Sequence, residues 1–324
     1  MHRTLLACGL AAGLLAAAGQ AGAATFTSFW AFGDSLSDDG NLSAATGGAV
    51  PAPPYWEGRV SNGQVWAEHV ARRFSNNDLE TGNFAFAYGA AGDPPPFSPV
   101  PSPPVQNLSG QLELFDAAAP GRLGKRPLAS LWFGANDLFF GGIPTGTAAA
   151  VGTAAADRVA DGALALKDRG VRDVMLWNLP SIDETPAFKI INPGGAQQAK
   201  EGSDAFNARL DERISGLRDQ GVRVTKMDAH ALFRALIDDP AAFGVIDATT
   251  PCYVPGTDIY CGADMAPLLA FFDPVHPSST IHAALAREAL ARVQPVPLPA
   301  PVALLLAGLA ALGVLGRRRA TGVA

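Results

Sequence analysis

Four short apolar segments alternate with longer segments of helical pattern along the middle of this 324-residue chain. The apolar segments cover residues 26–34, 128–137, 171–181 and 222–228. Short apolar strands separated by helices of a dozen or more residues are typical of a parallel sheet with helices on both faces. The pattern therefore predicts an α/β fold, a three-layer α/β/α sandwich with a mostly parallel sheet, in one domain at 25–293.

The segments between these strands carry the signals of amphipathic helices. Apolar side chains recur at helical spacing on one face of residues 62–74. Two longer segments, 147–170 and 194–221, end at Gly170 and Gly221. Glycine is common just past the end of a helix because it adopts the left-handed conformation without strain. These segments supply the helices that the sandwich requires.

Residues 1–24 have the composition of a signal peptide. A basic start is followed by an apolar run and by small residues near Ala24. A buried N-terminal helix is the alternative, but the run lacks the polar face of a surface helix. We therefore expect export of the chain, to the cell surface or the extracellular space.

Residues 294–324 contain a proline-rich stretch, an apolar run at 302–315 and three arginines at 317–319. The apolar run is shorter than the roughly 20 residues that span a bilayer comfortably, although neutral flanks extend it. This tail resembles the PEP-CTERM type of bacterial sorting signal, in a VPLPA variant at 296–300. The resemblance implies contact with the sorting and processing machinery of the cell envelope and a transient membrane anchor. A permanent C-terminal membrane anchor is the alternative.

The charge balance argues against nucleic acid as a partner. The chain has 24 Lys and Arg residues against 30 Asp and Glu, a net charge of −6. Proteins that bind nucleic acid carry a basic surplus to contact the phosphates. We therefore expect no nucleic-acid binding.

Two cysteines remain after the predicted leader, Cys252 and Cys261, with Pro, Gly and Asp between them. An exported chain meets an oxidising compartment, where a disulfide that closes this loop is favoured. Two thiols without nearby histidines or a second cysteine pair form a poor zinc site. We therefore expect a Cys252–Cys261 disulfide and no metal.

Two irregular stretches interrupt the alternation. Residues 92–111 contain enough proline to exclude strand pairing and helix, and are either a stiff surface loop or a lid beside a site. Residues 240–277 form a long irregular region before the last helix, and irregular segments of that length are commonly functional.

Ser35 directly follows the first predicted strand, in the sequence Gly33-Asp34-Ser35. Ligands of open parallel sheets bind beyond the carboxyl ends of the strands, so Ser35 lies where a reactive group is expected. A serine is a weak nucleophile by itself and requires a base within hydrogen-bond reach.

Asp273 and His276 form the best candidate partner, in the sequence Asp-Pro-Val-His-Pro. A residue that precedes proline is pushed toward extended backbone, so both side chains lie on a stiff turn ahead of the last helix. The aspartate can then accept from Nδ1 of the imidazole and leave Nε2 free to take a proton from a hydroxyl. A loop cap and a surface histidine are the alternative.

The remaining histidines of the mature chain have simpler interpretations. His69, His230 and His282 all fall on predicted helices, and the last of these helices has Ser278 or Ser279 as its cap. Each histidine is most simply a packed or surface residue.

Three blocks together resemble the GDSL lipase/esterase family, the SGNH hydrolases. They are FGDSLSDDGN at 32–41, GAND at 134–137 and DPVHP at 273–277, in the order of the family's own blocks. Residues 58–71 also resemble a segment that many extracellular members carry. Each block alone is weak evidence, whereas the set is specific and covers most of 25–293.

The resemblance implies a role for each matching residue. Ser35 would be the nucleophile, His276 the base and then the acid, and Asp273 the group that orients the imidazole. The backbone N–H of Ser35 and the side-chain amide of Asn136 would donate to the oxyanion of the tetrahedral intermediate. The second block departs from the family pattern, so the glycine that completes the oxyanion hole is Gly89 or, in another register, Gly92.

The function implied is that of an exported serine hydrolase acting on carboxylic esters without a cofactor or metal. The substrate classes are lipids, short acyl esters and acylated polysaccharides. Two alternatives remain at this point: an acyltransferase that uses the same site, and a surface or matrix protein that keeps the fold without the chemistry.

Overall fold

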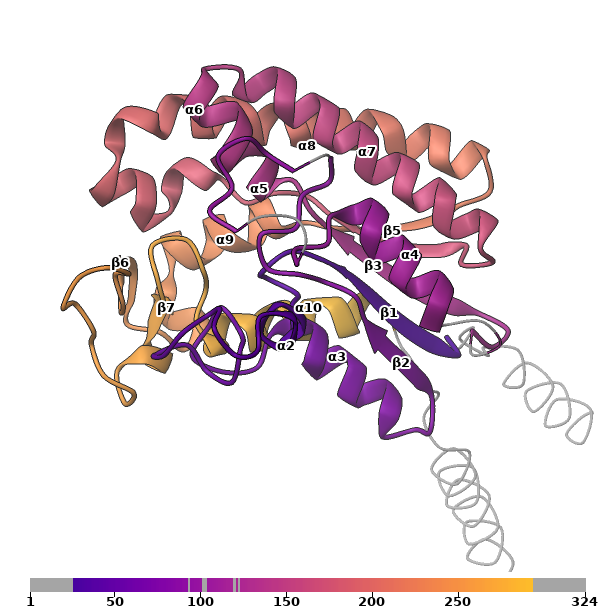
Figure 1. Ribbon diagram of the computed structural model, residues 1–324, viewed down its shortest axis with the longest axis horizontal. Helices are drawn as coiled ribbons and strands as arrows, with labels where there is room; N and C mark the ends of the chain where they lie inside the picture. The colour runs from indigo at the N-terminus through magenta and orange to yellow at the C-terminus, as the bar shows by residue number, and fades with distance from the viewer. Residues whose placement is uncertain (1–25, 93, 101–103, 119–120, 122, 294–324) are drawn as a thin grey trace, which may run out of the picture. The chain divides into compact units, whose positions relative to one another are not determined.

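The computed structural model describes residues 26–92, 94–100, 104–118, 121 and 123–293 (Figure 1). The predicted signal peptide and the predicted C-terminal tail lie outside the described residues. Within the described part, Thr27–Val293 form one compact unit.

A five-stranded parallel sheet forms the centre of this unit, in the order β2-β1-β3-β4-β5. Its strands are β1 (Ser28–Gly33), β2 (Glu80–Asn83), β3 (Pro127–Trp132), β4 (Asp173–Trp177) and β5 (Arg223–Met227). The four predicted strands correspond to β1, β3, β4 and β5, which confirms the α/β class and the parallel sheet. The fifth, β2, is a short polar edge strand without an apolar pattern.

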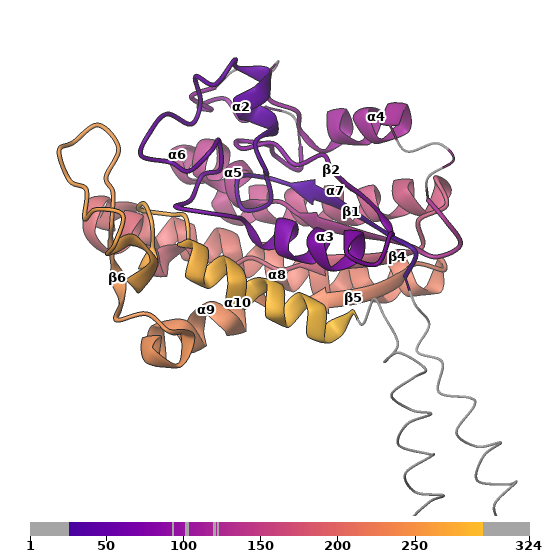
Figure 2. The same cartoon turned by 90° about the horizontal axis from the view of Figure 1, so that it is seen from below.

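Helices cover both faces of the sheet (Figures 1 and 2). On one face lie α3 (Trp66–Ser75) and α10 (Ser279–Arg292), and on the other α4 (Leu108–Ala118), α7 (Ala148–Asp168) and α8 (Ala196–Asp219). Successive residues of a strand point to opposite faces. Accordingly Phe29 contacts Trp66 of α3, whereas its neighbour Trp30 contacts Phe115 of α4.

The predicted helices begin and end close to the expected residues. Helix α3 begins at Trp66, within the predicted 62–74. Helices α7 and α8 are followed by Gly170 and Gly221, which have φ angles of 93° and 86°. The expectation that no helix forms within the proline-rich residues 92–111 was wrong, because α4 begins at Leu108. The last proline of this stretch is at residue 104, so the residues after it are free to form a helix.

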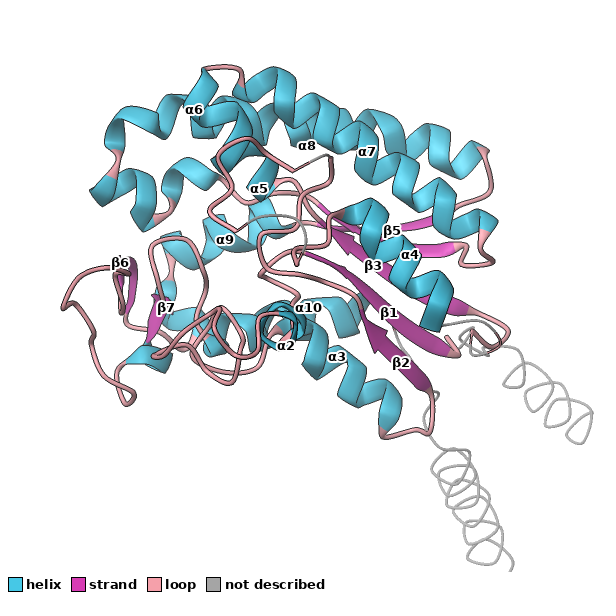
Figure 3. Ribbon diagram, viewed as in Figure 1, coloured by secondary structure: helices cyan, strands magenta, loops and turns pink. Residues whose placement is uncertain are grey.

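Shorter elements complete the described chain. A separate two-stranded parallel sheet pairs β6 (Asp247–Pro251) with β7 (Leu269–Phe271). The remaining elements are α2 (Asn41–Ala45), α5 (Ala135–Asp137), α6 (Ile143–Thr145), α9 (Ala229–Asp238), the π-helical turns η1 (Leu138–Gly142) and η3 (Ala187–Ile191), and the 3₁₀ turns η2 (Ile182–Glu184), η4 (Pro193–Gly195), η5 (Pro240–Phe243) and η6 (Ala266–Leu268). Long loops gather at one end of the five-stranded sheet (Figure 3). None of the helices among the described residues is both long and apolar enough to cross a bilayer.

Candidate active site

Ser35 lies in the tight turn that leaves β1. The N–H groups of Ser37 and Asp38 donate to the Asp34 carbonyl at 3.0 Å, which reverses the chain. A side chain at Gly33 would bring its Cβ to 2.8 Å from the Trp132 carbonyl oxygen, so only glycine allows this close approach to β3. Ser35 is 8% exposed.

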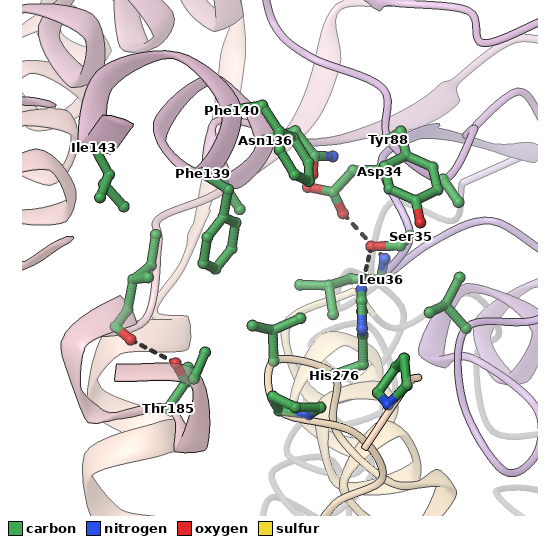
Figure 4. Close-up of a pocket in the computed structure, with 18 of the residues that line it drawn as sticks. Asp34, Ser35, Leu36, Tyr88, Asn136, Phe139, Phe140, Ile143, Thr185 and His276 are labelled. Atoms are coloured by element: carbon green, nitrogen blue, oxygen red, sulfur yellow. Dashed lines mark hydrogen bonds between the residues drawn. The ribbon is translucent and has the colours of Figure 1, made fainter. Parts of the chain in front are cut away.

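The structure brings Ser35, His276 and Asp273 into one hydrogen-bonded series, of which Figure 4 shows Ser35 and His276. Oγ of Ser35 lies 2.7 Å from Nε2 of His276, although 241 residues separate them. On the other side of the imidazole, Nδ1 lies 2.7 Å from Oδ2 of Asp273. This is the arrangement in which an imidazole can take the serine proton while a carboxylate orients it.

The turn at 273–277 holds the aspartate in place. Oδ1 of Asp273 accepts from the N–H groups of Val275 and His276, both at 2.8 Å. The N–H of Phe272 donates to the His276 carbonyl at 2.8 Å and closes the turn. Burial raises the pKa of Asp273, but His276 and the hydrogen bonds outweigh it and hold that pKa below its usual value. The carboxylate is therefore charged and fixed beside the imidazole.

Tyr55 is a member of the site that sequence reasoning missed. Its hydroxyl donates to Oδ2 of Asp273 at 2.6 Å. The ring is held edge-on against Tyr253 and Phe272. Burial, together with the charge of Asp273, raises the pKa of Tyr55 far above its usual value, so the hydroxyl keeps its proton. No local pattern near residue 55 indicates this contact, because the partner lies 218 residues away.

Asn136 lies in the short helix that follows β3, as its block predicted. Its side chain is 7% exposed, and Nδ2 donates to the Gly89 carbonyl at 2.9 Å. An amide nitrogen carries two N–H groups, so this bond leaves one of them for another acceptor. The neighbouring carboxylate of Asp137 accepts from the N–H groups of Ala91 and Gly92 and ties this helix to the 84–92 loop.

The two glycines proposed for the oxyanion hole use their N–H groups elsewhere. The Gly89 N–H donates to the Phe86 carbonyl at 2.8 Å, and the Gly92 N–H donates to Oδ1 of Asp137 at 3.1 Å. In this structure neither N–H group is available to an oxyanion. Gly89 instead contributes its carbonyl, which orients the amide of Asn136.

Tyr88, directly before Gly89, has an unusual backbone conformation. It has a φ of 66°, which is uncommon for a residue with a side chain and costs of order 1–3 kcal/mol. Together with the bond from Gly89 to Phe86 and the negative φ of Ala87, this angle defines a type II turn. Within the described residues, the N–H groups of Tyr88 and Ser35 have no acceptor, and both residues border the same cavity as Asn136.

Asp34 is a buried carboxyl group beside the nucleophile. One of its oxygens accepts from the Leu36 N–H at 3.0 Å. Burial raises the pKa of Asp34 to about 7, with a further contribution from Asp137, while the Leu36 bond and His276 act in the opposite direction. At neutral pH this group is therefore partly protonated, which reduces the negative charge near Ser35.

A cavity of about 940 Å³ opens onto these groups. Ser35, His276, Asn136 and Tyr88 border it at one end, and apolar side chains line most of the remainder. A carbonyl carbon that reaches Ser35 thus enters a largely apolar site.

The comparison with known families agrees with this geometry. The sequence profile described as GDSL-like Lipase/Acylhydrolase matches residues 29–289. The chain belongs to this family. The match includes the five strands of the main sheet, except the first residue of β1, and also Ser35, Asn136, Asp273 and His276.

Three curated proteins are similar to the chain. A phosphatidylcholine-sterol acyltransferase of Aeromonas hydrophila is 26% identical over 313 residues, covering 80% of this chain and 87% of that protein. A thermolabile hemolysin of Vibrio parahaemolyticus serotype O3:K6 (strain RIMD 2210633) is 28% identical, covering 80% and 62%. An acetylesterase of Thermothelomyces thermophilus is 28% identical, covering 68% and 76%. The family and these relatives identify the chain as an ester-hydrolysing enzyme.

The other histidines among the described residues lie away from Ser35. His69 is half-buried on α3, and Nδ1 of His230 lies 3.4 Å from Oγ of Ser181. His282 is fully buried on α10, where Nδ1 accepts from the Trp66 N–H at 3.2 Å. Burial lowers the pKa of His282 to about 3, so it is neutral. His276 is thus the histidine that borders the cavity.

The two cysteines face each other, with their sulfur atoms 1.95 Å apart. Their loop packs near Tyr55 and Phe272 at the edge of the site. Across the described part of the chain, no group of three or more His, Cys, Asp or Glu side chains is placed to hold a metal ion.

Proposed function

We propose that this protein is an exported serine esterase that forms an acyl-enzyme on Ser35. The observation that carries the proposal is the continuous series from Oγ of Ser35 through His276 to Asp273, with a distance of 2.7 Å at each step. Membership of the GDSL-like family supports the reaction class. The apolar cavity beside Ser35 supports an ester with a hydrophobic part as substrate.

In the acylation step, Oγ of Ser35 attacks the ester carbonyl carbon while Nε2 of His276 takes its proton. The charge of Asp273 stabilises the imidazolium that forms. The carbonyl oxygen becomes an oxyanion, and the N–H groups of Ser35 and Tyr88 and the free N–H of the Asn136 amide are its donors. Each such donor contributes about 10² to 10³ in rate. The imidazolium then gives its proton to the departing alcohol.

Deacylation repeats these steps with water. His276 takes a proton from a water molecule as its oxygen attacks the acyl carbon, and the proton then returns to Oγ of Ser35. Every proton moves between the substrate, water and these side chains.

Transfer of the acyl group to an alcohol is a second candidate. The observation that favours it is the 26% identity to a protein named phosphatidylcholine-sterol acyltransferase, across 87% of that protein. The two reactions share the acyl-enzyme and differ in the acceptor that resolves it. Product analysis with a p-nitrophenyl ester in the presence of a sterol or a long-chain alcohol separates them, because transfer yields a new ester and hydrolysis yields only the free acid.

Export is part of the proposal and rests on residues outside the described part. The basic and apolar composition of residues 1–24 supports it, and the PEP-CTERM-like tail at 294–324 supports processing at the cell envelope. Expression of the full chain in a Gram-negative host, followed by fractionation and N-terminal sequencing, tests it. Cleavage near Ala24 with the mature chain outside the cytoplasm is expected, and an uncleaved cytoplasmic chain contradicts it.

Covalent labelling tests the mechanism. Diethyl p-nitrophenyl phosphate reacts with activated serines, so the intact mass should rise by one diethylphosphoryl group and peptide mapping should place it on Ser35. The variant His276→Ala should label far more slowly, because the base is absent. Labelling at another residue, or equal labelling rates in both proteins, would count against the proposal.

A further inference from the structure

One part of the cavity extends away from Ser35 between two walls, and we call it the η1–η3 arm. One wall consists of Phe139 and Phe140 of η1 and Ile143 of α6. The opposite wall consists of Ile182 of η2 and of Phe188 and Ile191 of η3. Figure 4 shows Phe139, Ile143 and Thr185 on the side of the cavity away from Ser35 and Tyr88.

The arm is continuous with the oxyanion donors. The ring of Tyr88 lies 5.9 Å from that of Phe140, so the η1 wall begins beside Tyr88. Phe139 follows Asn136 by three residues on the same helical run. A carbonyl whose oxygen lies at these donors is therefore at the entrance of the arm.

Aromatic packing brings the two walls into contact at Phe139 and Phe188, and both residues line the cavity beside this contact. The rings of Phe139 and Phe188 stack at 5.9 Å with 8° between their planes. Both walls include a π-helical turn, a rare conformation that is frequent at functional sites.

Apart from Asn192 at the end of η3, the side chains of the arm offer little to a polar ligand. The buried Thr185 hydroxyl donates to the Ile182 carbonyl at 2.7 Å, so its O–H is not available to a ligand. Among the residues described as lining the cavity, the titratable side chains are Asp34, Tyr55, Tyr88 and His276, which belong to the Ser35 end. A sugar in the arm would lose hydrogen bonds to water without replacement, whereas an alkyl chain would gain from burial.

We propose that the η1–η3 arm binds the acyl chain of the substrate and that this enzyme therefore acts on esters of medium-chain and long-chain fatty acids. Acetyl groups on polysaccharides would leave the arm empty. The inference rests on the proposed function, since the arm selects a chain only if Ser35 attacks the carbonyl. A cavity of about 940 Å³ is at the upper end of the usual range for small-molecule sites, which suits a chain far larger than acetyl.

Two ester series test the inference on the purified protein below the critical micelle concentration of each substrate. The first keeps p-nitrophenol as the alcohol and lengthens the acyl chain from acetate to decanoate. The second keeps acetate and lengthens the alcohol from ethyl to decyl. We expect kcat/KM to rise with acyl length, by up to about fourfold for each methylene that enters the arm, and to change little with alcohol length. A preference for acetate, or a rise only in the alcohol series, would overturn the inference.

A pair of Ile→Trp variants tests whether the arm causes the preference for long acyl chains. Ile143→Trp adds bulk inside the arm and should lower the ratio of decanoate to acetate kcat/KM by at least tenfold. Ile246→Trp is the matched control, because Ile246 is 68% exposed and does not line the cavity. Ile143→Ala widens the same position and should move the optimum to longer chains. An equal ratio in the parent and both Ile143 variants would overturn the inference, while inactivity of the parent on every ester would instead refute the proposed function.

Discussion

The hydroxyl of Tyr55 donates to the same oxygen of Asp273 that faces the imidazole of His276. The two distances are 2.6 Å from Oη of Tyr55 and 2.7 Å from Nδ1 of His276. The other oxygen of Asp273 is held by two backbone N–H groups. Tyr55 therefore holds Oδ2 of the carboxylate while backbone N–H groups hold Oδ1, and it is a positioning residue for the proposed mechanism.

Tyr55→Phe should lower kcat about tenfold with little change in KM. A hydrogen bond to a charged group is worth about 1.5–3 kcal/mol, and part of that is lost from the orientation of Asp273. Tyr253→Phe is the matched control, since its ring packs against Tyr55 at 5.5 Å and it makes no hydrogen bond to Asp273 in the structure. Equal kinetics for both variants would show that the Tyr55 hydroxyl does not position the carboxylate.

Tyr88 should tolerate glycine better than a β-branched residue. Its proposed contribution is the backbone N–H, which Tyr88→Gly retains at a φ of 66° without strain. Tyr88→Ile disfavours that φ and should shift the N–H, lowering kcat on p-nitrophenyl acetate at least tenfold relative to Tyr88→Gly. If the glycine variant loses as much activity as the isoleucine variant, the side chain rather than the backbone is responsible.

Asn136→Ala should lower kcat/KM about 10² to 10³-fold, because it removes one oxyanion donor while Ser35 and His276 remain in place. Thermal melting checks that the fold survives, since the Gly89 carbonyl also loses its partner. A folded variant that retains more than a fifth of the parent kcat/KM would exclude Asn136 from the oxyanion hole.

Asp34→Asn should stabilise the protein at pH 8 but not at pH 4. Burial raises the pKa of Asp34 to about 7 in the folded state, against 3.8 ordinarily. As the pH rises from 4 to 7, the Asp34 carboxyl group ionises in the unfolded chain but stays largely protonated in the folded protein. The free energy of unfolding therefore falls by up to about 4 kcal/mol over this range. Asparagine keeps an acceptor for the Leu36 N–H and cannot ionise. Urea unfolding of the parent and the variant measures the difference in their free energies of unfolding at each pH. The same difference at pH 4 and at pH 8 would contradict this account.

The sequence was sufficient to predict the parts of the site that follow local rules. Ser35 and Asn136 follow apolar strands, and parallel strands place their carboxyl ends at one edge. Asp273 and His276 lie on a turn restricted by two prolines. The local sequence around Ser35 and around Asp273 and His276 was therefore enough to predict the hydrogen-bonded series that these three residues form.

The missed parts depend on the conformation of loops and on contacts between them. The structure leaves the N–H of Tyr88 rather than that of Gly89 without an acceptor among the described residues, because a type II turn directs the Gly89 N–H to Phe86. An aromatic residue at positive φ could not be foreseen from the sequence. Tyr55 contacts Asp273 across 218 residues of sequence, from a loop without a periodic pattern. Strand β2 has the polar sequence Glu-Thr-Gly-Asn, which does not resemble a strand.

Ester hydrolysis by Ser35→Ala is the most direct test of the central claim. The substrate is p-nitrophenyl butyrate. Thermal melting first checks that the variant unfolds at the same temperature as the parent. The account predicts a fall in kcat of at least about 10⁴-fold, because the variant lacks the only atom that attacks the carbonyl in the proposed mechanism. A kcat within tenfold of the parent would contradict it.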